Sequence, residues 1–330
     1  MKPSKVVVTG ALALFLSACG VSIVPRGFTD QTPLQMRRAT APASRSPSYL
    51  YVANNGYPGT AVDVFDRDDL RKAPVRRITN RVAYPSGIFV DPYDNLYVAD
   101  GTGSGHDHVT MYNNEGKLVR IYRGLESAVD VVVGRDGTVY AADCDGRRVL
   151  EYAPNSTKLI RTLELPGVGC VASLALDSKN DLYVGFTLKV SMGWSQVRRY
   201  APGSMRGVDL LPRKTVFLIG GIGIDKSGDL VVVNYGAIDV FKEPKKPPVR
   251  IINTGQQLPS SFAWSRDQSA MYVSSTYEGN ARRLTGSGPK LANTVVEITY
   301  PAGKRLALLR FAQRGYGYPT GVAVFPPAPL

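Results

Sequence analysis

The sequence predicts an all-β protein built as a six-bladed β-propeller, and three observations support this prediction. The apolar runs are mostly four to seven residues long and rich in Val, Ile and Tyr, without the rhythm of a helix. A pentapeptide of the form Leu-Tyr-Val-Ala-Asp returns about every 45 residues. The 33 Gly and 23 Pro of the 330-residue chain suit the many turns that short strands require.

The pentapeptide predicts the second strand of every blade. Its hydrophobicity is continuous rather than alternating, which is typical of a strand covered on both faces by neighbouring sheets. The spacings between successive copies are 46, 43, 43, 48 and 41 residues. The six copies begin at Leu50, Leu96, Val139, Leu182, Leu230 and Met271.

Three more strands accompany each copy. A strand of the form Val/Ile-x-x-Phe/Tyr follows, and its six occurrences are 62–65, 109–112, 149–152, 197–200, 238–241 and the degenerate 295–298. An outer strand comes next, at 75–79, 117–123, 159–165, 214–220, 248–254 and 305–311. A short inner strand of small residues, closed by a turn of Asp, Asn, Gly or Ser, precedes the next pentapeptide. Four strands in about 45 residues predict one propeller blade.

The order of the strands also predicts how the ring closes. The repeat region, 47–330, begins with a second strand, "YLYVAN", and has no inner strand before it. It ends with an inner strand, "PTGVAVF" at 319–325, that no second strand follows. The last strand is therefore expected to complete the first blade, which leaves no inner edge unpaired.

The N-terminus predicts export. Lys2 and Lys5 precede an apolar run and then Leu16-Ser17-Ala18-Cys19, which together form a secretory signal. The apolar run is shorter than the ~20 residues that span a bilayer. The tetrapeptide Leu16-Ser17-Ala18-Cys19 resembles the lipobox of bacterial lipoproteins. An ordinary signal peptide with a chance Cys is the alternative.

The lipobox resemblance implies a division of the N-terminal region and a location. Residues 1–18 would be removed as a lipoprotein signal peptide, and Cys19 would carry the lipid. Residues 19–46 would then form the lipidated Cys and a flexible tether, about 30 Å from end to end. The protein is expected to be anchored to a bacterial membrane, the outer one where there are two, and to face the periplasm or the exterior. Acyl chains would supply this anchor without a transmembrane helix.

One repeat carries a more specific resemblance. The segment 84–122, "YPSGIFVDPYDNLYVADGTGSGHDHVTMYNNEGKLVRIY", resembles an NHL repeat in its inner strand, turn, second strand and charged turn. The resemblance extends over about 47–330 and implies a six-bladed propeller near the NHL and gluconolactonase/lactonase-type families. Such propellers include binding modules and enzymes alike, so the resemblance does not decide the activity.

A candidate ligand or metal face follows from the strand order. Loops after each second strand and before each inner strand share one end of a propeller, called the upper face below. Lactonase-type propellers hold a divalent ion there through Glu, Asn and Asp, and oxygen ligands suit Ca²⁺. Asp100, Asp130, Asp143 and Asn234 could offer such oxygens, but the family's glutamate has no match. The candidate residues are Asn54, Asn55, Asp100, Asp130, Asp143, Asn234 and Tyr235.

Other catalytic constellations are missing from the sequence. Zinc sites of the amidating-lyase propellers take His from several blades, whereas His106 and His108 share one loop here. The sequence contains no GxSxG elbow, Walker loop, CxxC pair or specific nucleic-acid motif. No catalytic residue is assigned and no cofactor is assured, with Ca²⁺ at the channel mouth as the open possibility.

The favoured function is therefore a lipid-anchored, non-catalytic binding or scaffold module of the cell envelope. Its expected ligand is a protein, peptide or glycan on the upper face, and the chain is expected to be monomeric. A metal-dependent lactonase or hydrolase is the first alternative. Binding of a polyanion or glycan is the second, because the net charge is +13 and Arg pairs are scattered along the chain.

Two cysteines other than Cys19 predict a disulfide. Cys144 directly follows the second strand of the third blade, and Cys170 precedes the inner strand of the fourth. Both positions belong to the upper face, so the two residues are expected to meet across adjacent blades. Outside the reducing cytosol they would form a disulfide. Two buried free thiols are the alternative.

Overall fold

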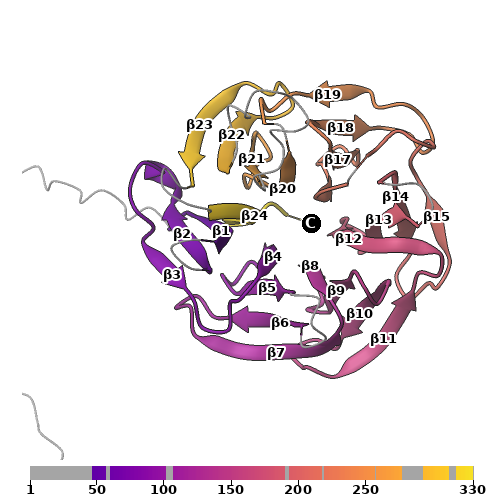
Figure 1. The fold of residues 1–330 in the computed structure, drawn as a ribbon, viewed down its shortest axis with the longest axis horizontal. Coiled ribbons are helices and arrows are strands. Elements are labelled where there is room, and N and C mark those ends of the chain that lie inside the picture. Colours follow the sequence, from indigo (N-terminus) through magenta and orange to yellow (C-terminus); the bar gives the residue numbers. More distant parts are fainter. Residues whose placement is uncertain are drawn as a thin grey trace, which may run out of the picture. The chain divides into compact units, whose positions relative to one another are not determined.

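The computed structural model describes residues 47–56, 60–101, 107–189, 193–217, 219–256, 258–276, 293–311 and 317–329. They form six four-stranded antiparallel sheets, arranged as the blades of a ring around a central axis (Figure 1). The predicted six-bladed β-propeller is therefore confirmed. The expected signal peptide, Cys19 and tether at 1–46 lie outside the described residues.

The strands of each blade run from the axis to the outer edge. Blade 1 consists of β24 (Gly317–Phe325), β1 (Tyr49–Gly56), β2 (Ala61–Asp66) and β3 (Arg76–Ile78). Blade 2 consists of β4 (Pro85–Val90), β5 (Leu96–Asp100), β6 (Asp107–Tyr112) and β7 (Leu118–Leu125). Blade 3 consists of β8 (Ala128–Val133), β9 (Val139–Asp143), β10 (Arg148–Tyr152) and β11 (Leu159–Glu164). Blade 4 consists of β12 (Val168–Leu176), β13 (Leu182–Leu188), β14 (Ser195–Tyr200) and β15 (Gly207–Asp209). Blade 5 consists of β16 (Ile222–Ile224), β17 (Leu230–Asn234), β18 (Ala237–Phe241) and β19 (Arg250–Ile252). Blade 6 consists of β20 (Pro259–Trp264), β21 (Ala270–Ser275), β22 (Thr294–Thr299) and β23 (Arg305–Arg310).

Helical structure is minimal in the described part of the chain. A single 3₁₀ turn, η1 (Arg67–Asp69), follows β2, and the side chain of Asp66 caps it by accepting a hydrogen bond from the backbone N–H of Asp68. No helix among the described residues is long and apolar enough to cross a membrane.

The ring closes through blade 1 as the sequence predicts. The inner strand β24 pairs antiparallel with β1, and Tyr49 lies opposite Phe325 at the lower end of the blade. The 317–325 strand thus serves as the inner strand of blade 1. In the other five blades the first two strands are joined by a short turn. These turns define the lower face of the propeller.

The hydrophobic core consists of six clusters, one at each contact between neighbouring blades. Successive residues of a second strand enter opposite clusters: Leu50 packs toward blade 6 and Tyr51 toward blade 2. Both side chains are fully buried. This is why the pentapeptides are continuously hydrophobic, and the expected cover on both faces is confirmed.

The outer strand of blade 4 was predicted wrongly. The strand that pairs with β14 is β15, and not 214–220, because Arg198 lies opposite Asp209 and their side chains form an ion pair of 2.6 Å. The 214–220 segment instead crosses toward blade 5 and buries Val216 and Ile219 between blades 4 and 5. Its apolar residues therefore serve the contact between blades.

Candidate functional site

The inner strands approach one another closely at one level of the ring. A Cβ atom on Gly321 would lie 2.2 Å from the backbone oxygen of Ser86, and one on Gly87 would lie 2.1 Å from Oδ1 of Asp130. Small residues are therefore required at most positions of this level, as expected for a crowded axis. Each inner strand contributes one residue to this level, directly before the residue that pairs with the third residue of the pentapeptide. The six residues of the level are Gly87, Asp130, Ser173, Gly221, Ser261 and Gly321.

Asp130 is the one charged residue of this level. Its Oδ2 accepts hydrogen bonds from the backbone N–H of Leu174 at 2.8 Å and from the hydroxyl of Ser173 at 3.2 Å. Its Oδ1 accepts a bond from the N–H of Val131. Burial is the largest influence and raises the pKa of the Asp130 carboxyl to about 6, against the opposing effect of these donors. The carboxyl is therefore poised to change charge near neutral pH.

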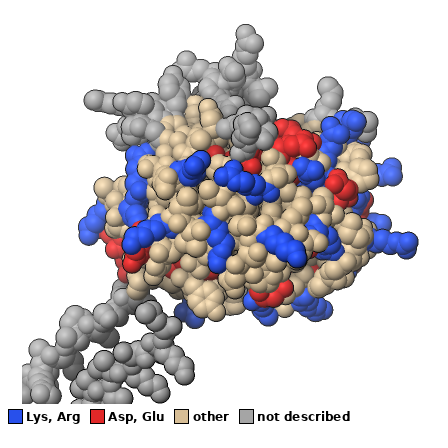
Figure 2. Space-filling model, turned by 90° about the horizontal axis from the view of Figure 1, so that it is seen from below, with Lys and Arg blue, Asp and Glu red and all other residues tan. Residues whose placement is uncertain are grey.

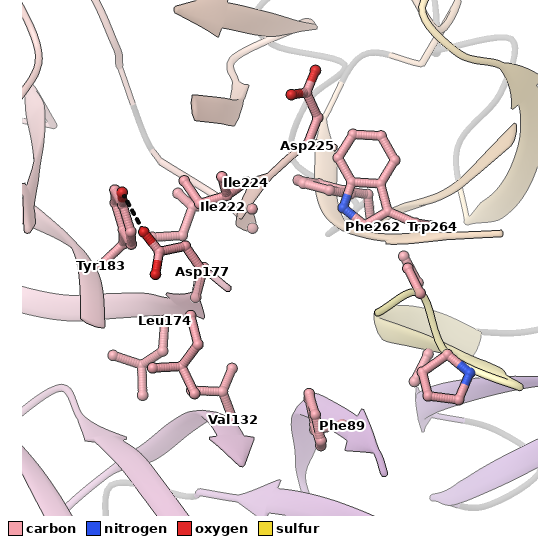
Figure 3. Close-up of a pocket in the computed structure, with 18 of the residues that line it drawn as sticks. Phe89, Val132, Leu174, Asp177, Tyr183, Ile222, Ile224, Asp225, Phe262 and Trp264 are labelled. Carbon is pink, nitrogen blue, oxygen red and sulfur yellow. Dashed lines mark hydrogen bonds between the residues drawn. The ribbon is translucent and has the colours of Figure 1, made fainter. Parts of the chain in front are cut away.

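Below this level the channel widens into a cavity of about 750 Å³, a volume suited to a small ligand or a peptide segment. All six inner strands contribute to its wall. Apolar side chains dominate the close-up in Figure 3, with Phe89 on one side and Phe262 and Trp264 on the other. The rings of Phe262 and Trp264 meet edge to face at 5.1 Å, and Trp264 meets Tyr300 at 4.5 Å. These contacts hold the aromatic wall in place.

The mouth of the cavity lies among the turns of the lower face. Asp177 begins one turn and accepts hydrogen bonds from two backbone N–H groups and from the hydroxyl of Tyr183 (Figure 3). Asp225 begins the next turn and does the same with the hydroxyl of Tyr300 at 2.7 Å. The carboxylates at the mouth therefore hold the turns and the surrounding tyrosines rigidly.

The segment after β24 forms part of the rim. Pro327, Ala328 and Pro329 line the cavity, at the end of the one blade that has no turn between its first two strands. Pro329 also contacts a second, shallower depression beside Arg266 and Asp267. The proline-rich segment thus narrows the mouth from the side of blade 1.

The upper-face candidates mostly fasten their own loops. Asp100 accepts hydrogen bonds from the backbone N–H groups of Ala83 and Tyr84, at 2.6 and 2.8 Å. Asp143 is fully buried; it accepts bonds from three backbone N–H groups and pairs with the guanidinium of Arg148 at 2.9 Å. Both acids hold the loop that leads into the inner strand of their blade.

The asparagine candidates behave in the same way. Asn54 donates to the carboxylate of Asp63, and Asn234 donates to that of Asp239. Asn234 also accepts bonds from the N–H groups of Phe217 and Tyr235. Asn55 is half-buried opposite Tyr318, and the side chain of Tyr235 is 39% exposed.

The candidates predicted together thus occupy two different places. Six lie at the upper ends of second strands or directly after them, in blades 1, 2, 3 and 5, whereas Asp130 lies inside the channel. Among the described residues no group of three or more His, Cys, Asp or Glu is placed to hold a metal ion. His106, which shares its loop with His108, lies outside the described residues.

The predicted disulfide is confirmed. Cys144 and Cys170 are bonded, with Cα atoms 4.4 Å apart, and join the end of β9 in blade 3 to β12 in blade 4. The bond lies next to the loop that Asp143 fastens. It therefore adds a covalent link to a region already held by hydrogen bonds.

The aromatic wall of the cavity is the feature that sequence reasoning missed. Phe89, Phe262 and Trp264 belong to inner strands, where the repeat pattern otherwise favours small residues. The available signal was an aromatic residue at a position that is aliphatic or Gly in the other blades. The position of Phe89 holds Val, Ala or Gly elsewhere, and the positions of Phe262 and Trp264 hold Val, Leu or Ile. The predicted site residues lie instead mostly at the upper face.

Fold and cavity together define a six-bladed β-propeller whose channel opens on the lower face. No protein-family model and no curated protein matches the sequence. Among solved structures, the chain is similar to one in a crystal structure of a nidogen/laminin complex, with 14% identity, TM-score 0.65, and 84% of this chain and 98% of that one covered.

Two other solved structures are reported for comparison. A protein of unknown function from Bacteroides caccae has 15% identity and TM-score 0.61, with 84% of this chain and 99% of that one covered. Virginiamycin B lyase from Staphylococcus aureus superposes less closely, with 13% identity, TM-score 0.48, and 72% and 73% covered. At 14% and 15% identity, the likeness to the first two structures establishes the fold alone.

Proposed function

We propose that this protein is a binding module that takes its ligand into the cavity of the propeller channel from the lower face. The observation that carries the proposal is the cavity itself, with a volume of about 750 Å³ and a wall that includes Phe89, Phe262 and Trp264. Binding pockets are typically of this size, mostly apolar, with few polar groups. The ligand is a small molecule or peptide segment with an apolar or aromatic group that packs against this wall.

The lower mouth has more support as the ligand site than the upper face expected from the sequence. The carboxylates of Asp100 and Asp143 are already occupied by backbone N–H groups, so a ligand would have to displace those bonds. Among the described residues, the rings of the aromatic wall make edge-to-face contacts with one another and with Tyr97 and Tyr300, and no hydrogen bond that a ligand would have to displace.

Tryptophan fluorescence tests the proposal directly. The chain has two Trp, so a Trp194→Phe variant reports on Trp264 alone. With the apolar dye 1-anilinonaphthalene-8-sulfonate as probe, we expect saturable binding at one site with energy transfer from Trp264. Phe89→Ala should weaken it about tenfold, the loss of one buried aromatic contact. Tyr93→Ala is the matched control, since Tyr93 lies on a lower-face turn, is 81% exposed and is outside the cavity wall. Equal losses in both variants, or no saturable binding, would contradict the proposal.

We further propose that the module is exported and held on a bacterial membrane through a lipid on Cys19. The lipobox-like sequence before Cys19 and the Cys144–Cys170 disulfide support export, because disulfides persist outside the reducing cytosol. Fractionation of cells that express the full chain tests this. The chain should sediment with membranes even in high salt, about 0.5 M, and Cys19→Ala should release it under that condition. Membrane retention of the Cys19→Ala chain in high salt would count against the anchor.

A further inference from the structure

The net positive charge of the chain is concentrated on the outer edges of the blades. Six segments contain the outer strands and the turns before them: 67–79, 114–125, 154–165, 201–214, 242–254 and 301–311. They hold 20 Lys and Arg against 6 Asp and Glu, a net charge of +14, although the whole chain carries only +13. The remainder of the chain is therefore close to neutral, and the edges carry the excess.

The charge is not distributed evenly around the ring. The segments 242–254 and 301–311 of blades 5 and 6, called the basic edge below, comprise 24 residues with seven Lys or Arg and one acid. The corresponding 24 residues of blades 2 and 3, in 114–125 and 154–165, have five Lys or Arg and two acids. In Figure 1 the basic edge follows β19 and β23, on the side of the ring away from β7 and β11.

The basic edge and the outer edges of blades 2 and 3 also differ in how their cations are neutralised. In blades 2 and 3, Lys117 pairs with Glu115 and Arg161 pairs with Glu151. Figure 2 views this side and shows Asp and Glu between the Lys and Arg. Within the part of the chain that the structure describes, no cation of the basic edge forms an ion pair with a carboxylate, and all are exposed. These cations are Lys242, Lys245, Lys246, Arg250, Lys304, Arg305 and Arg310.

Large aliphatic side chains stand among these cations. Val249, Ile251 and Leu306 are 61%, 66% and 54% exposed, respectively. Exposed cations alone would fit any polyanion, and they also prevent edge-to-edge pairing of strands. Protruding aliphatic groups between cations fit a surface that has negative charge with an apolar layer directly beneath it. A bilayer with anionic headgroups is such a surface.

We propose that the basic edge docks the propeller on the surface of an anionic lipid bilayer. The cations bind headgroup phosphates, and the three aliphatic side chains enter the boundary between headgroups and acyl chains. Blade 1, where the chain arrives from residue 47 into β1, is the neighbour of blade 6. Docking by this edge sets the propeller axis along the membrane plane, so that neither end of the channel faces the bilayer.

The test separates this surface from the lipid anchor proposed above by using the full chain with Cys19→Ala. We expect it to sediment with vesicles of phosphatidylcholine and about one third phosphatidylglycerol, but not with phosphatidylcholine alone. Raising the salt from about 0.1 to 0.5 M should release it, because screening shortens the reach of the charges. Failure to bind anionic vesicles overturns the docking proposal and leaves the anchor and the channel site untouched.

Two sets of variants locate the surface. We expect vesicle binding to weaken about 10- to 100-fold when Gln replaces Lys245, Lys246, Lys304 and Arg305 together. Replacing Lys158, Lys189, Arg206 and Arg213 with Gln removes the same charge and should change binding less than about threefold. These cations of blades 3 and 4 are also exposed and form no ion pair with a described carboxylate. Equal losses in the two sets would mean that net charge alone matters, which overturns the proposal.

The aliphatic residues distinguish a bilayer from a polyanionic chain. Ser at Val249, Ile251 and Leu306 should weaken vesicle binding about 3- to 10-fold, whereas Ser at Val119, Leu159 and Ile160 should leave it unchanged. Binding of dextran sulfate, which has no apolar layer, should not respond to either change. If the Ser substitutions at Val249, Ile251 and Leu306 leave vesicle binding unchanged, the surface binds polyanions in general and the proposal is overturned. Circular dichroism melts verify folding, and the pair Lys246→Gln and Lys304→Gln serves if a larger set unfolds.

Discussion

Two carboxylates of blade 3 lie thirteen residues apart and were predicted to belong to one site, yet their surroundings differ completely. Asp143 ends β9 at the upper face, where three N–H groups and the Arg148 guanidinium surround it. Asp130 lies in β8 at the narrow level of the channel, without a cation among its hydrogen-bond partners. The first charge is compensated and holds a loop, whereas the second is costly and lines a cavity. A residue type at a repeat position therefore does not define a role until its donors are known.

Removing the compensated carboxylate should have the largest effect. Asp143→Ala leaves three backbone N–H groups and Arg148 without their acceptor, and we expect it to lower the free energy of unfolding by about 4 kcal/mol. Urea denaturation of the purified protein measures this. Asp145→Ala, an exposed neighbour, should change the value by less than about 0.5 kcal/mol. Similar values for both variants would remove the contrast on which the comparison rests.

The disulfide beside Asp143 should come next. Replacing Cys144 and Cys170 with Ser opens a link that spans 26 residues, and the loop-closure estimate predicts a loss of about 3 kcal/mol. The same denaturation experiment, with and without reductant, measures it. Reductant should destabilise the wild-type protein by a similar amount and leave the double variant unchanged. A double variant as stable as the oxidised protein would show that hydrogen bonds alone hold this corner.

The channel carboxylate should reveal itself through pH. Burial raises the pKa of Asp130 to about 6, so the folded state holds the proton more tightly than the unfolded state. The contribution of this group to stability is therefore greatest at low pH and falls as the pH rises from about 4 to 6. Relative to Asp130→Asn, the wild-type protein should lose about 2 kcal/mol across this window. A difference that stays constant from pH 4 to 7 would mean that Asp130 has an ordinary pKa.

The smallest effect is expected in blade 2, where the same upper-face role is carried by fewer bonds. Asp100 accepts hydrogen bonds from two backbone N–H groups, and no cation among the described residues pairs with it as Arg148 pairs with Asp143. Asp100→Asn keeps one acceptor oxygen and should cost about 1 kcal/mol by thermal denaturation. A cost equal to that of Asp143→Ala would indicate that the guanidinium contributes little in blade 3.

Much of the fold followed from sequence because it repeats. Five of the six pentapeptides have Tyr at the second position, and the residues on either side of this position enter the core on the opposite face of the blade. Their period and register were therefore visible without a structure. The outer strand of blade 4 was missed because 214–220 has the composition of a strand but buries its apolar residues between blades. Hydrophobic pattern alone does not distinguish these two environments.

The candidate site was less accessible to such reasoning. Asp130 was found by its residue type, but its position in the channel depends on Gly87 in the neighbouring blade, 43 residues earlier. The cavity depends on side chains from all six inner strands, and no local motif encodes their convergence. Functional residues often lie in loops, whereas the aromatic wall of this cavity belongs to strands.

The pairing of β24 with β1 has a topological consequence. Because Tyr49 lies opposite Phe325, the backbone break in blade 1 occupies the place of the short turn found in each other blade. A ring of six similar blades has no intrinsic starting point. A peptide linker across this break, with a new opening at the lower-face turn of another blade such as Arg135–Gly137, should therefore give a circular permutant with the same fold. The position of the opening would then decide which blade closes the ring last.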